Sequence, residues 1–459
     1  MKIDLLMPEI RGGYARSNAR IAHLGLLYVA AVLKQGGHQV RTFDLLNNPR
    51  ARVDLSVPDV VGITCVSAQF NAGLRLAQEA KKQGKLTIMG GSHPTFTVEE
   101  TLKTGAVDFI IRGEGEYTAL ELVNRLADNG HGMDFSDIPG ISWLDRKTGR
   151  VVDNPSRPLI KDLDELPFPA RETLDMEPYK AFKLAYRPAV NVVTSRGCPH
   201  NCSYCVSTMI SGATYRMRKM SHVVDEIELL LREYGFGSIF FSDDNLTASP
   251  KRTRDLCREI QRRGLQFKWW CMSRVDTLVK NEELVREMAE AGCHQIFLGL
   301  ESPKDHVLQR YNKRVKASDE IEAVRLLKKY GINVHGGFMI GALNETREDV
   351  EATIDFPRKL RLEYAQFGIA TPLPGTRFYQ EVHSRLKTRD WDQFDGFHAL
   401  FDTDHLTTQE IESLMKRAYI RFFTSPHKLL SYLSPRKIAS TLLKIKFVLG
   451  LLFLNNRRS

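Results

Sequence analysis

The chain has 459 residues, of which 42% are hydrophobic and 26% charged, and its net charge is +10. This length and balance predict more than one globular domain, each able to build a buried core. The seven cysteines are odd in number and are not spread like a disulfide framework, and MKIDLLMPEI shows no signal-peptide pattern. We therefore expect a protein of the reducing cytoplasm, and the positive charge indicates an anionic partner or a membrane surface.

Residues 1–130 alternate between predicted strands and helices. Apolar runs such as KIDLLMP, PDVVGITCVS and KLTIMGG follow one another at β-α-β distances. Five buried strands with crossover helices predict a doubly wound, Rossmann-like parallel sheet, which binds ligands at the carboxyl ends of its strands. Turn residues are concentrated at these strand ends. They either form loops that contact a ligand or form tight turns without a binding role. The candidate ligand residues are Thr64, Ser67, Gly90, Gly91, His93, Gly113 and Glu114. No G-x-G-x-x-G follows the first strand, so a dinucleotide is not favoured.

The rest of the chain predicts a connection, a second α/β domain and a helical end. Residues 131–190 contain a small hairpin pattern and a Pro-rich stretch and are expected to link the two domains. Six β/α units over 191–380 predict an incomplete (β/α)6 TIM-type barrel, whose active site lies at the carboxyl ends of its strands. Residues 381–459 are expected to be helical, with an amphipathic tail.

The stretch RGCPHNCSYC places Cys198, Cys202 and Cys205 in the loop after the first barrel strand. Thiolates bind soft metals. A structural zinc site would need a fourth ligand, such as His200 or a distant cysteine. An iron–sulfur cluster held by only three thiolates leaves one iron open, where a substrate or cofactor can bind. The barrel context favours the cluster. The other cysteines are expected to pack in cores.

The C-x₃-C-x₂-C spacing after the first strand of a partial barrel resembles the radical S-adenosylmethionine (radical SAM) superfamily. In that family the three thiolates hold a 4Fe–4S cluster, S-adenosylmethionine binds the open iron, and one electron cleaves it to a 5′-deoxyadenosyl radical. The resemblance implies that six residues at the ends of the barrel strands, and one in the cysteine loop, contact the cofactor. They are Tyr204, Asp243, Asp244, Arg274, Glu301, Met339 and Ile340.

The resemblance also implies a role for each polar contact. Asp243 or Asp244 receives the cofactor's ammonium group, and the other carboxylate caps or orients. Arg274 suits the cofactor's carboxylate and Glu301 a ribose hydroxyl, although each could instead form a structural ion pair. Tyr204 lies beside the adenine or packs the loop.

The N-terminal half resembles the cobalamin-binding class of this superfamily. VGITCVS, IMGGSHPTF and IRGEGE look like its ligand loops, and the resemblance covers nearly all of residues 1–425. The D-x-H-x-x-G motif that supplies a histidine to cobalt is absent after the first strand, where the chain reads PEIRGGYARSN. His23 and His93 are possible substitutes, but we infer that cobalt lacks a histidine ligand, which would favour delivery of a methyl group.

The predicted function is a cobalamin-dependent radical SAM enzyme that methylates an unactivated carbon or phosphorus centre. The alternatives are an oxidative cyclase of a tetrapyrrole or similar substrate and a non-catalytic cobalamin or redox sensor. Expected partners are a small-molecule substrate and an electron donor such as flavodoxin or ferredoxin, with no nucleic acid.

The last residues, SYLSPRKIASTLLKIKFVLGLLFLNNRRS, combine six cations with an apolar run from Phe447 to Leu454. That run is far shorter than the ~20 residues of a membrane span. It predicts either an interfacial helix with cationic flanks or a helix docked on the protein. Peripheral membrane contact through this tail would suit a lipid-like substrate.

Overall fold

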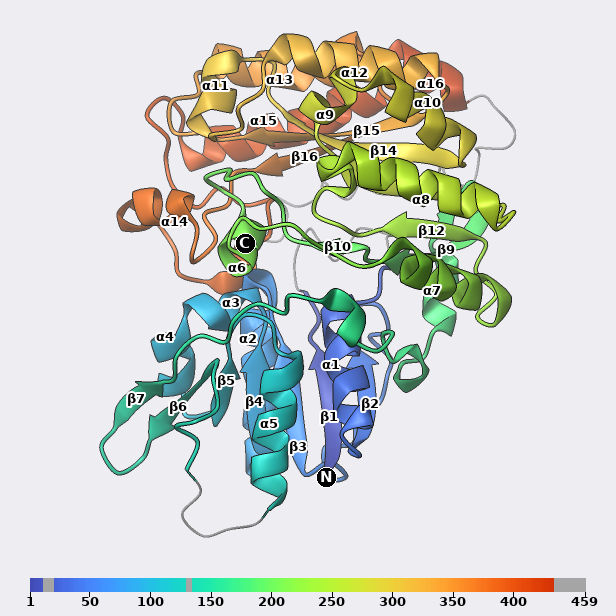
Figure 1. Ribbon diagram of the computed structural model, residues 1–459. Helices are drawn as coiled ribbons and strands as arrows, with labels where there is room; N and C mark the ends of the chain where they lie inside the picture. The colour runs from blue at the N-terminus through green and yellow to red at the C-terminus, as the bar shows by residue number, and fades with distance from the viewer. Residues whose placement is uncertain (11–19, 129–133, 433–459) are drawn as a thin grey trace.

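The computed structural model describes residues 1–10, 20–128 and 134–432. They form two α/β domains, each built from a sheet and the helices that cover it, and Figure 1 shows one above the other. The predicted fold class is confirmed: a doubly wound N-terminal sheet is followed by a partial barrel and a helical C-terminal region. Within these ranges no helix has both the length and the apolar character needed to span a membrane.

The first sheet has the order β2-β1-β3-β4-β5-β6-β7, in which β1 to β5 are parallel. Its strands are β1 (Lys2–Met7), β2 (Gln39–Asp44), β3 (Val60–Thr64), β4 (Leu86–Gly90), β5 (Phe109–Ile111), β6 (Ile141–Asp145) and β7 (Arg150–Asp153). The sequence hairpin between 131 and 190 forms β6 and β7, which extend this sheet in antiparallel fashion. Its helices are α1 (Leu24–Gln35), α2 (Phe70–Lys82), α3 (Ser92–Phe96), α4 (Val98–Lys103) and α5 (Glu116–Ala127).

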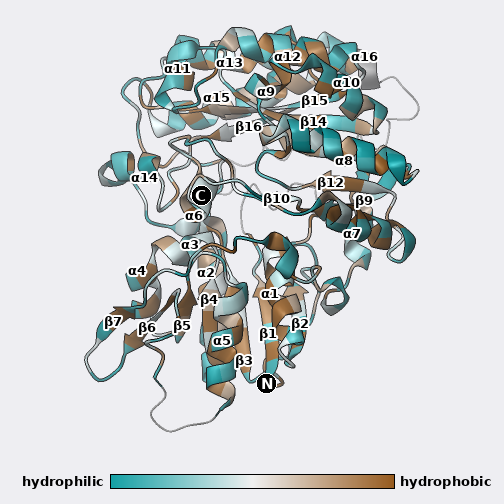
Figure 2. Ribbon diagram, viewed as in Figure 1, coloured by the Kyte–Doolittle hydropathy of each residue, from teal (hydrophilic) through white to brown (hydrophobic). Residues whose placement is uncertain are grey.

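The inner strands β1, β3, β4 and β5 form because most of their positions are apolar and both faces of the sheet are covered by helices. All five residues of β3 are buried, as are five of the six in β1. Figure 2 shows these strands in brown between helices whose outer faces are paler or teal. Continuous apolar runs of this kind are typical of parallel sheets buried on both sides.

The second sheet has the order β16-β15-β14-β13-β12-β9-β8 and is parallel except for β8. Its strands are β8 (Lys183–Leu184), β9 (Arg187–Val192), β12 (Ser238–Phe241), β13 (Lys268–Ser273), β14 (Cys293–Glu301), β15 (Asn333–Ile340) and β16 (Tyr364–Ile369), and a separate hairpin joins β10 (Ser195–Arg196) to β11 (Arg216–Met217). The six parallel strands are the incomplete barrel that the sequence predicts.

Helices cover the outer face of the second sheet. They are α7 (Met220–Arg232), α8 (Pro250–Arg262), α9 (Val275–Val279), α10 (Glu282–Glu290), α11 (Asp305–Arg310), α12 (Ala317–Lys329) and α13 (Arg347–Lys359), with α15 (Thr408–Phe423) and α16 (Pro426–Tyr432) from the C-terminal region. Two further helices, α6 (Val206–Ser211) and α14 (Arg377–Val382), lie toward the N-terminal domain (Figure 1). The inner face of the sheet and the ends of its strands therefore turn toward the first domain.

The two domains contact each other directly on one side through the C-terminal region. Trp391 packs against His93 with ring centroids 4.4 Å apart, and its Nε1 donates to Glu100 Oε1 across 2.8 Å. Because Trp391 is 5% exposed, this contact is part of a core that both domains share.

Candidate active site between the two domains

The three cysteines lie in a tight loop between β10 and α6. Cys205 forms the N-cap position of α6, and its N–H donates to the carbonyl of Cys202 across 3.2 Å. Gly197 precedes Cys198 with φ +91, and a Cβ there would lie 2.4 Å from the carbonyl oxygen of Thr214. Only glycine fits this turn, which folds the loop back on itself.

Neighbouring segments hold the loop in place. Ser203 donates its N–H to the carbonyl of Tyr311 and accepts from the N–H of Phe378, each across 3.0 Å. Asn201 accepts from Asn312 through its backbone carbonyl, across 2.5 Å. The loop is thus clamped between the segment after α11 and the start of α14, so its shape does not depend on a metal ion alone.

The cysteine loop offers three free thiols as metal ligands. Among the residues that the structure describes, no three His, Cys, Asp or Glu side chains converge on one point, as a metal ion would require. A zinc ion would hold each thiolate at about 2.3 Å. A 4Fe–4S cluster binds each thiolate to a different iron, so its three ligands stay apart. Three thiols are the ligand set of a 4Fe–4S cluster that leaves one iron open, and a zinc ion would need His200 or another residue as a fourth ligand.

Burial shapes the chemistry of these thiols. It raises the pKa of Cys198 and of Cys205, because a thiolate loses its solvation in the half-buried loop. A bound metal would reverse this effect, since a coordinating thiol is deprotonated outright. Ligation must therefore supply the energy that keeps these side chains ionised.

Tyr204 and Glu301 meet beside the cysteine loop. The Tyr204 hydroxyl donates to Glu301 Oε1 across 3.0 Å, and Lys313 Nζ lies 2.7 Å from the same oxygen. Glu301 has φ +57, a left-handed conformation that a non-glycine residue adopts at a cost. Burial is the main cause that raises the pKa of Tyr204, so its hydroxyl stays protonated as a donor. Glu301 keeps its second oxygen, Oε2, for another partner.

Arg274, expected to bind the cofactor's carboxylate, is already bonded to protein groups. Its Nη1 donates to Cys202 Sγ across 3.8 Å, its Nη2 to the carbonyl of Lys313 across 2.6 Å and its Nε to Asp276 across 3.1 Å. It is 8% exposed. The guanidinium group therefore anchors the cluster loop, and the carboxylate role stays a prediction that needs one of these bonds to change.

The two adjacent aspartates follow the end of β12 and have different surroundings. Asp243 is fully buried and accepts from the backbone and hydroxyl of Thr194 and from the hydroxyl of Ser195. Asp244 is exposed, lines the cavity described below and accepts from the hydroxyl of Ser207 across 2.6 Å. Cofactor contact by Asp243 is therefore corrected to a structural role, and Asp244 is the aspartate free to meet a ligand.

Successive side chains of a strand point to opposite faces, and this separates Met339 from Ile340 on β15. Ile340 is 0% exposed and belongs to the core under the outer helices. Met339 is half-buried on the opposite side of the strand. The expectation that both side chains contact adenine is corrected: a contact from the Ile340 side chain is excluded, and Met339 alone faces the interior of the barrel.

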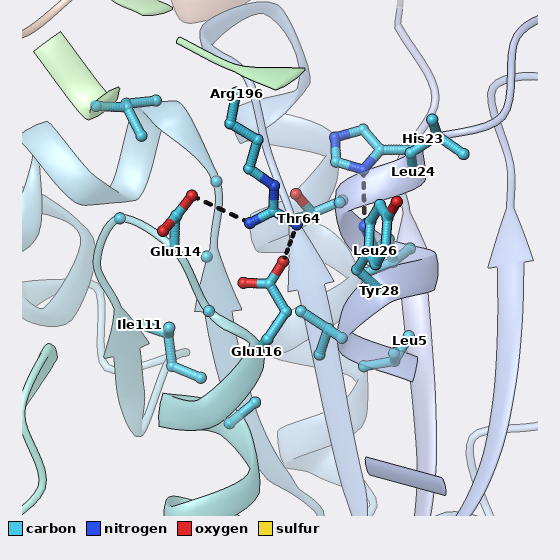
Figure 3. Close-up of a pocket in the computed structure, with 18 of the residues that line it drawn as sticks. Leu5, His23, Leu24, Leu26, Tyr28, Thr64, Ile111, Glu114, Glu116 and Arg196 are labelled. Carbon is cyan, nitrogen blue, oxygen red and sulfur yellow. Dashed lines mark hydrogen bonds and ion pairs between the residues drawn. The ribbon is translucent and has the colours of Figure 1, made fainter. Parts of the chain in front are cut away.

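A cavity of about 510 Å³ lies between the domains, at the carboxyl ends of β3, β4 and β5 (Figure 3). Its deep part is apolar, between the sheet and the helices α1 and α5. Its walls on the barrel side include Gly197, next to the first cluster cysteine, and Asp244. Five predicted ligand residues line it: Thr64, Gly90, Gly91, Gly113 and Glu114. The cavity therefore extends from the ligand edge of the first domain to Gly197 at the start of the cluster loop, and the three cysteines are not among its lining residues.

Two of these predicted residues are more strongly tied to protein than expected. A Cβ at Gly91 would lie 2.6 Å from the backbone oxygen of Cys65, so this glycine is required by the turn itself. Glu114 accepts from Arg196 and Arg216 and from the N–H of Ile160. These cations hold the pKa of Glu114 below its usual range despite its burial. Glu114 thus fastens the first domain to the β10–β11 hairpin.

His93 is corrected from a candidate ligand to a core residue. Its ring lies 4.2 Å from that of Phe70 and 4.4 Å from that of Trp391, and its Nδ1 is 3.0 Å from the Ser67 hydroxyl. Burial lowers the pKa of His93 to about 3. Neither His93 nor Ser67 lines the cavity. A residue from the distant C-terminal region covers this histidine, which the local sequence does not indicate.

His23 does line the cavity but is not set up as a cobalt ligand. It is the N-cap of α1, and its Nδ1 accepts from the N–H of Leu26 across 3.1 Å. Burial lowers the pKa of His23, which favours the neutral ring. With Nδ1 as acceptor, the proton of the neutral ring is on Nε2, which then acts as a donor.

Three further residues line the cavity: Glu116, which lies in the predicted IRGEGE ligand loop, and Tyr28 and Arg196, which the sequence did not indicate (Figure 3). Arg196 directly precedes the cysteine motif, yet its side chain reaches the first domain, where Nη2 donates to Glu116 Oε1 across 2.6 Å. The guanidinium also lies 5.0 Å from the centre of the Tyr28 ring. The RGEGE stretch after β5 indicates Glu116 as a ligand-loop residue. Tyr28 lies within α1, and no local sequence pattern indicates that it lines a cavity.

Comparison with known proteins agrees with this geometry. Residues 192–356 match the family model of the radical SAM superfamily, and residues 11–123 match the B12 binding domain. The chain thus carries both parts that the cysteine loop and the first sheet indicate.

Relatives and solved structures define the family further. An uncharacterized methyltransferase of Pyrococcus horikoshii is 36% identical over 94% of both chains. The anaerobic magnesium-protoporphyrin IX monomethyl ester cyclase of Rubrivivax gelatinosus is 29% identical over 92% of this chain and 77% of its own, and the hopanoid C-3 methylase of Methylococcus capsulatus is 29% identical over 85% and 74%. The methyltransferase TsrM of Kitasatospora setae, solved with cobalamin and a 4Fe–4S cluster, has a TM-score of 0.68 at 20% identity, covering 83% of this chain and 78% of TsrM.

These findings establish the chain as a radical SAM enzyme. More specifically, it belongs to the cobalamin-dependent radical SAM family of methyltransferases and cyclases, with a 4Fe–4S cluster, S-adenosylmethionine and cobalamin as its cofactors. The residues present fit these groups. The loop supplies three free, half-buried thiols, and the cavity has glycine-lined edges and buried polar atoms without a protein partner. The non-catalytic sensor alternative is therefore set aside.

Proposed function

We propose that this enzyme methylates an unactivated carbon or phosphorus centre of an apolar small molecule in the cavity between its domains. The observation that carries the proposal is that one cavity is lined both by the loops after β4 and β5 and by Gly197 of the cluster loop. When bound, the cofactors supply a 5′-deoxyadenosyl radical that activates the substrate and a methyl group that replaces the abstracted hydrogen. A shared cavity lets both act on one substrate atom.

We propose that four residues of this chain hold S-adenosylmethionine beside the cluster. Asp244 meets its ammonium group, because this carboxylate is exposed at the cavity wall. Glu301 offers its second oxygen to a ribose hydroxyl, and Tyr204, fixed by its bond to Glu301, packs beside the adenine. Met339 supports the adenine from β15. Lys313 orients Glu301 and does not touch the cofactor.

An apolar substrate is supported by the barrel side of the cavity. Ile210 of α6 lines the cavity, and Met209 and Met217 nearby in the sequence are 40% and 46% exposed. Exposed methionines suit an adaptable apolar contact. The relative named a hopanoid C-3 methylase points to the same class of substrate. Ring closure on a tetrapyrrole is the second candidate, because a relative named as a cyclase covers 92% of this chain.

The experiment uses enzyme reconstituted anaerobically with iron, sulfide and methylcobalamin, a flavodoxin or ferredoxin reductant, and S-adenosylmethionine with a deuterated methyl group. Lipid extract of the source cells is the substrate pool. We expect 5′-deoxyadenosine, S-adenosylhomocysteine and a lipid that has gained a labelled methyl group. A product that has lost hydrogen without gaining label supports the cyclase instead. Labelled methyl only in polar metabolites contradicts the apolar class.

A low-potential electron donor is generic to radical SAM enzymes. We propose a cytoplasmic enzyme that receives electrons from flavodoxin or ferredoxin and contacts a membrane through its tail. The cationic and apolar tail that motivates this contact lies outside the described residues, so the contact depends on the sequence pattern alone.

A further inference from the structure

Three buried polar atoms on residues that line the shared cavity have no hydrogen-bond partner in the protein. One is Arg216 Nε, whose guanidinium is already bound to Glu114 and Ile160 through its two other nitrogens. The other two are the Tyr28 hydroxyl and Glu116 Oε2. Both residues are 3% exposed. A buried polar group without a partner is destabilising, so such atoms point to a missing ligand. Arg196 is close to both residues: it donates to Glu116 Oε1 and lies 5.0 Å from the centre of the Tyr28 ring (Figure 3).

The Tyr28 hydroxyl and Glu116 Oε2 define which hydrogen-bonding groups the ligand must carry. Glu116 Oε1 is taken by Arg196, and a carboxylate oxygen such as Oε2 can only accept, so its partner must be an N–H or O–H donor. The Tyr28 hydroxyl can donate to a carbonyl. His23, on the same wall, presents an Nε2–H donor because its Nδ1 is used as the N-cap.

A primary carboxamide satisfies both demands, since it carries an NH₂ donor and a carbonyl acceptor. A carboxylate in the same place would offer no donor to Glu116 and would repel it. The corrin ring of cobalamin bears several primary amides around its edge. We propose that Glu116, assisted by Tyr28, selects a corrinoid whose side chains are amidated and rejects one with free carboxylates. This inference rests on the proposed location of cobalamin in this cavity.

The test measures anaerobic binding of two probes by absorbance titration: methylcobalamin and the corresponding monocarboxylic acids, in which one side-chain amide is hydrolysed. The wild-type enzyme should prefer the amide form by about tenfold, the scale of one lost hydrogen bond to a charged group. Glu116→Gln can donate to a carboxylate and should remove most of this preference. Tyr28→Phe should weaken binding of the amide form several-fold.

Glu114→Gln is the matched control. It removes the same charge beside the same arginine, but both Glu114 oxygens already have protein partners, so the ratio between the two probes should stay at the wild-type value. Iron content and the thermal midpoint show that each variant is folded. A Glu116→Gln enzyme with an unchanged ratio overturns the inference. A wild-type enzyme that takes up neither probe overturns the proposed cobalamin site itself, which is a separate result.

Discussion

Arg274 donates an N–H to the sulfur of Cys202 across 3.8 Å while its other terminal nitrogen holds the carbonyl of Lys313. Lys313 in turn pairs with Glu301, and Glu301 accepts from Tyr204, two residues after Cys202. The contacts close a ring around one edge of the proposed cluster. A ligand of the cluster and two proposed contacts of S-adenosylmethionine are therefore held by one network.

The first prediction concerns the potential of the cluster. N–H donors and positive charge beside a ligating sulfur stabilise the reduced state. Arg274→Gln should therefore make the midpoint potential more negative, as measured by potentiometric titration followed by EPR. The control is Arg314→Gln. This exposed arginine directly follows Lys313 and donates to Asn312, and its replacement should leave the potential unchanged. An unchanged potential in Arg274→Gln would show that the N–H···S contact is not electrostatically significant.

The second prediction concerns the metal. Alanine at Cys198, Cys202 or Cys205 should abolish a cluster of about four irons per chain, because each thiolate binds its own iron. Iron and sulfide analysis and EPR after anaerobic reconstitution give the readout. Alanine at Cys271, a fully buried thiol in the barrel core, should leave the iron content unchanged. Active enzyme containing zinc in place of iron would refute the cluster.

The third prediction concerns the turn before the cluster. Gly197→Ala should lose most of the iron and destabilise the fold by about 1–3 kcal/mol, since its Cβ would meet a backbone oxygen at 2.4 Å and its φ is +91. Gly212→Ala is the matched control: its φ is +68, but the nearest atom is 3.9 Å away. It carries the same backbone penalty without the clash. Similar iron loss in both variants would assign the effect to backbone strain alone.

The fourth prediction concerns His93 and pH. Burial lowers the pKa of His93 in the folded protein to about 3, from about 6.5 in the unfolded chain, so the unfolded chain takes up the extra proton as the pH falls. Stability from the neutral ring is therefore full above pH 6.5 and decreases below it. From pH 7 to pH 5 the wild type should lose about 2 kcal/mol more than His93→Gln in urea unfolding. The absorption spectrum of bound cobalamin should be the same in both, and a changed spectrum would restore His93 as a ligand.

The fifth prediction concerns the tail. Truncation after Tyr432 should abolish binding to anionic vesicles, which in the full chain should weaken as salt rises because each basic residue contributes ~1 kcal/mol at such a surface. Deoxyadenosine formation should persist. The cut follows α16 because Lys428 is buried and donates to the carbonyl of Glu363, so a cut before it would damage the barrel. If the full chain ignores vesicles, the membrane contact is wrong.

Some features of the fold and the site could be predicted from the sequence, and others could not. The cysteine spacing and the strand-end glycines have local causes, so the cluster loop and the ligand edge of the first sheet were predictable. Strand alternation could also have separated Met339 from Ile340. The partners of His93 and Arg196 were not predictable, because Trp391 and Glu116 reach them from distant parts of the chain. Tertiary packing decided whether each of these side chains is a ligand or a structural contact.

The shared wall of the cavity has a consequence for the order of events in turnover. The first domain is held to the barrel on two sides, by Trp391 against His93 and by Arg196 and Arg216 on Glu114. Contacts on both flanks oppose a swing of this domain toward a second methyl source. We therefore expect that a cobalamin bound in this cavity would receive its methyl group and pass it on in the same place. The methyl source and the substrate would then occupy the cavity one after the other. A substrate that stays too long would then block its own next turnover, and inhibition at high substrate concentration would be built into the architecture.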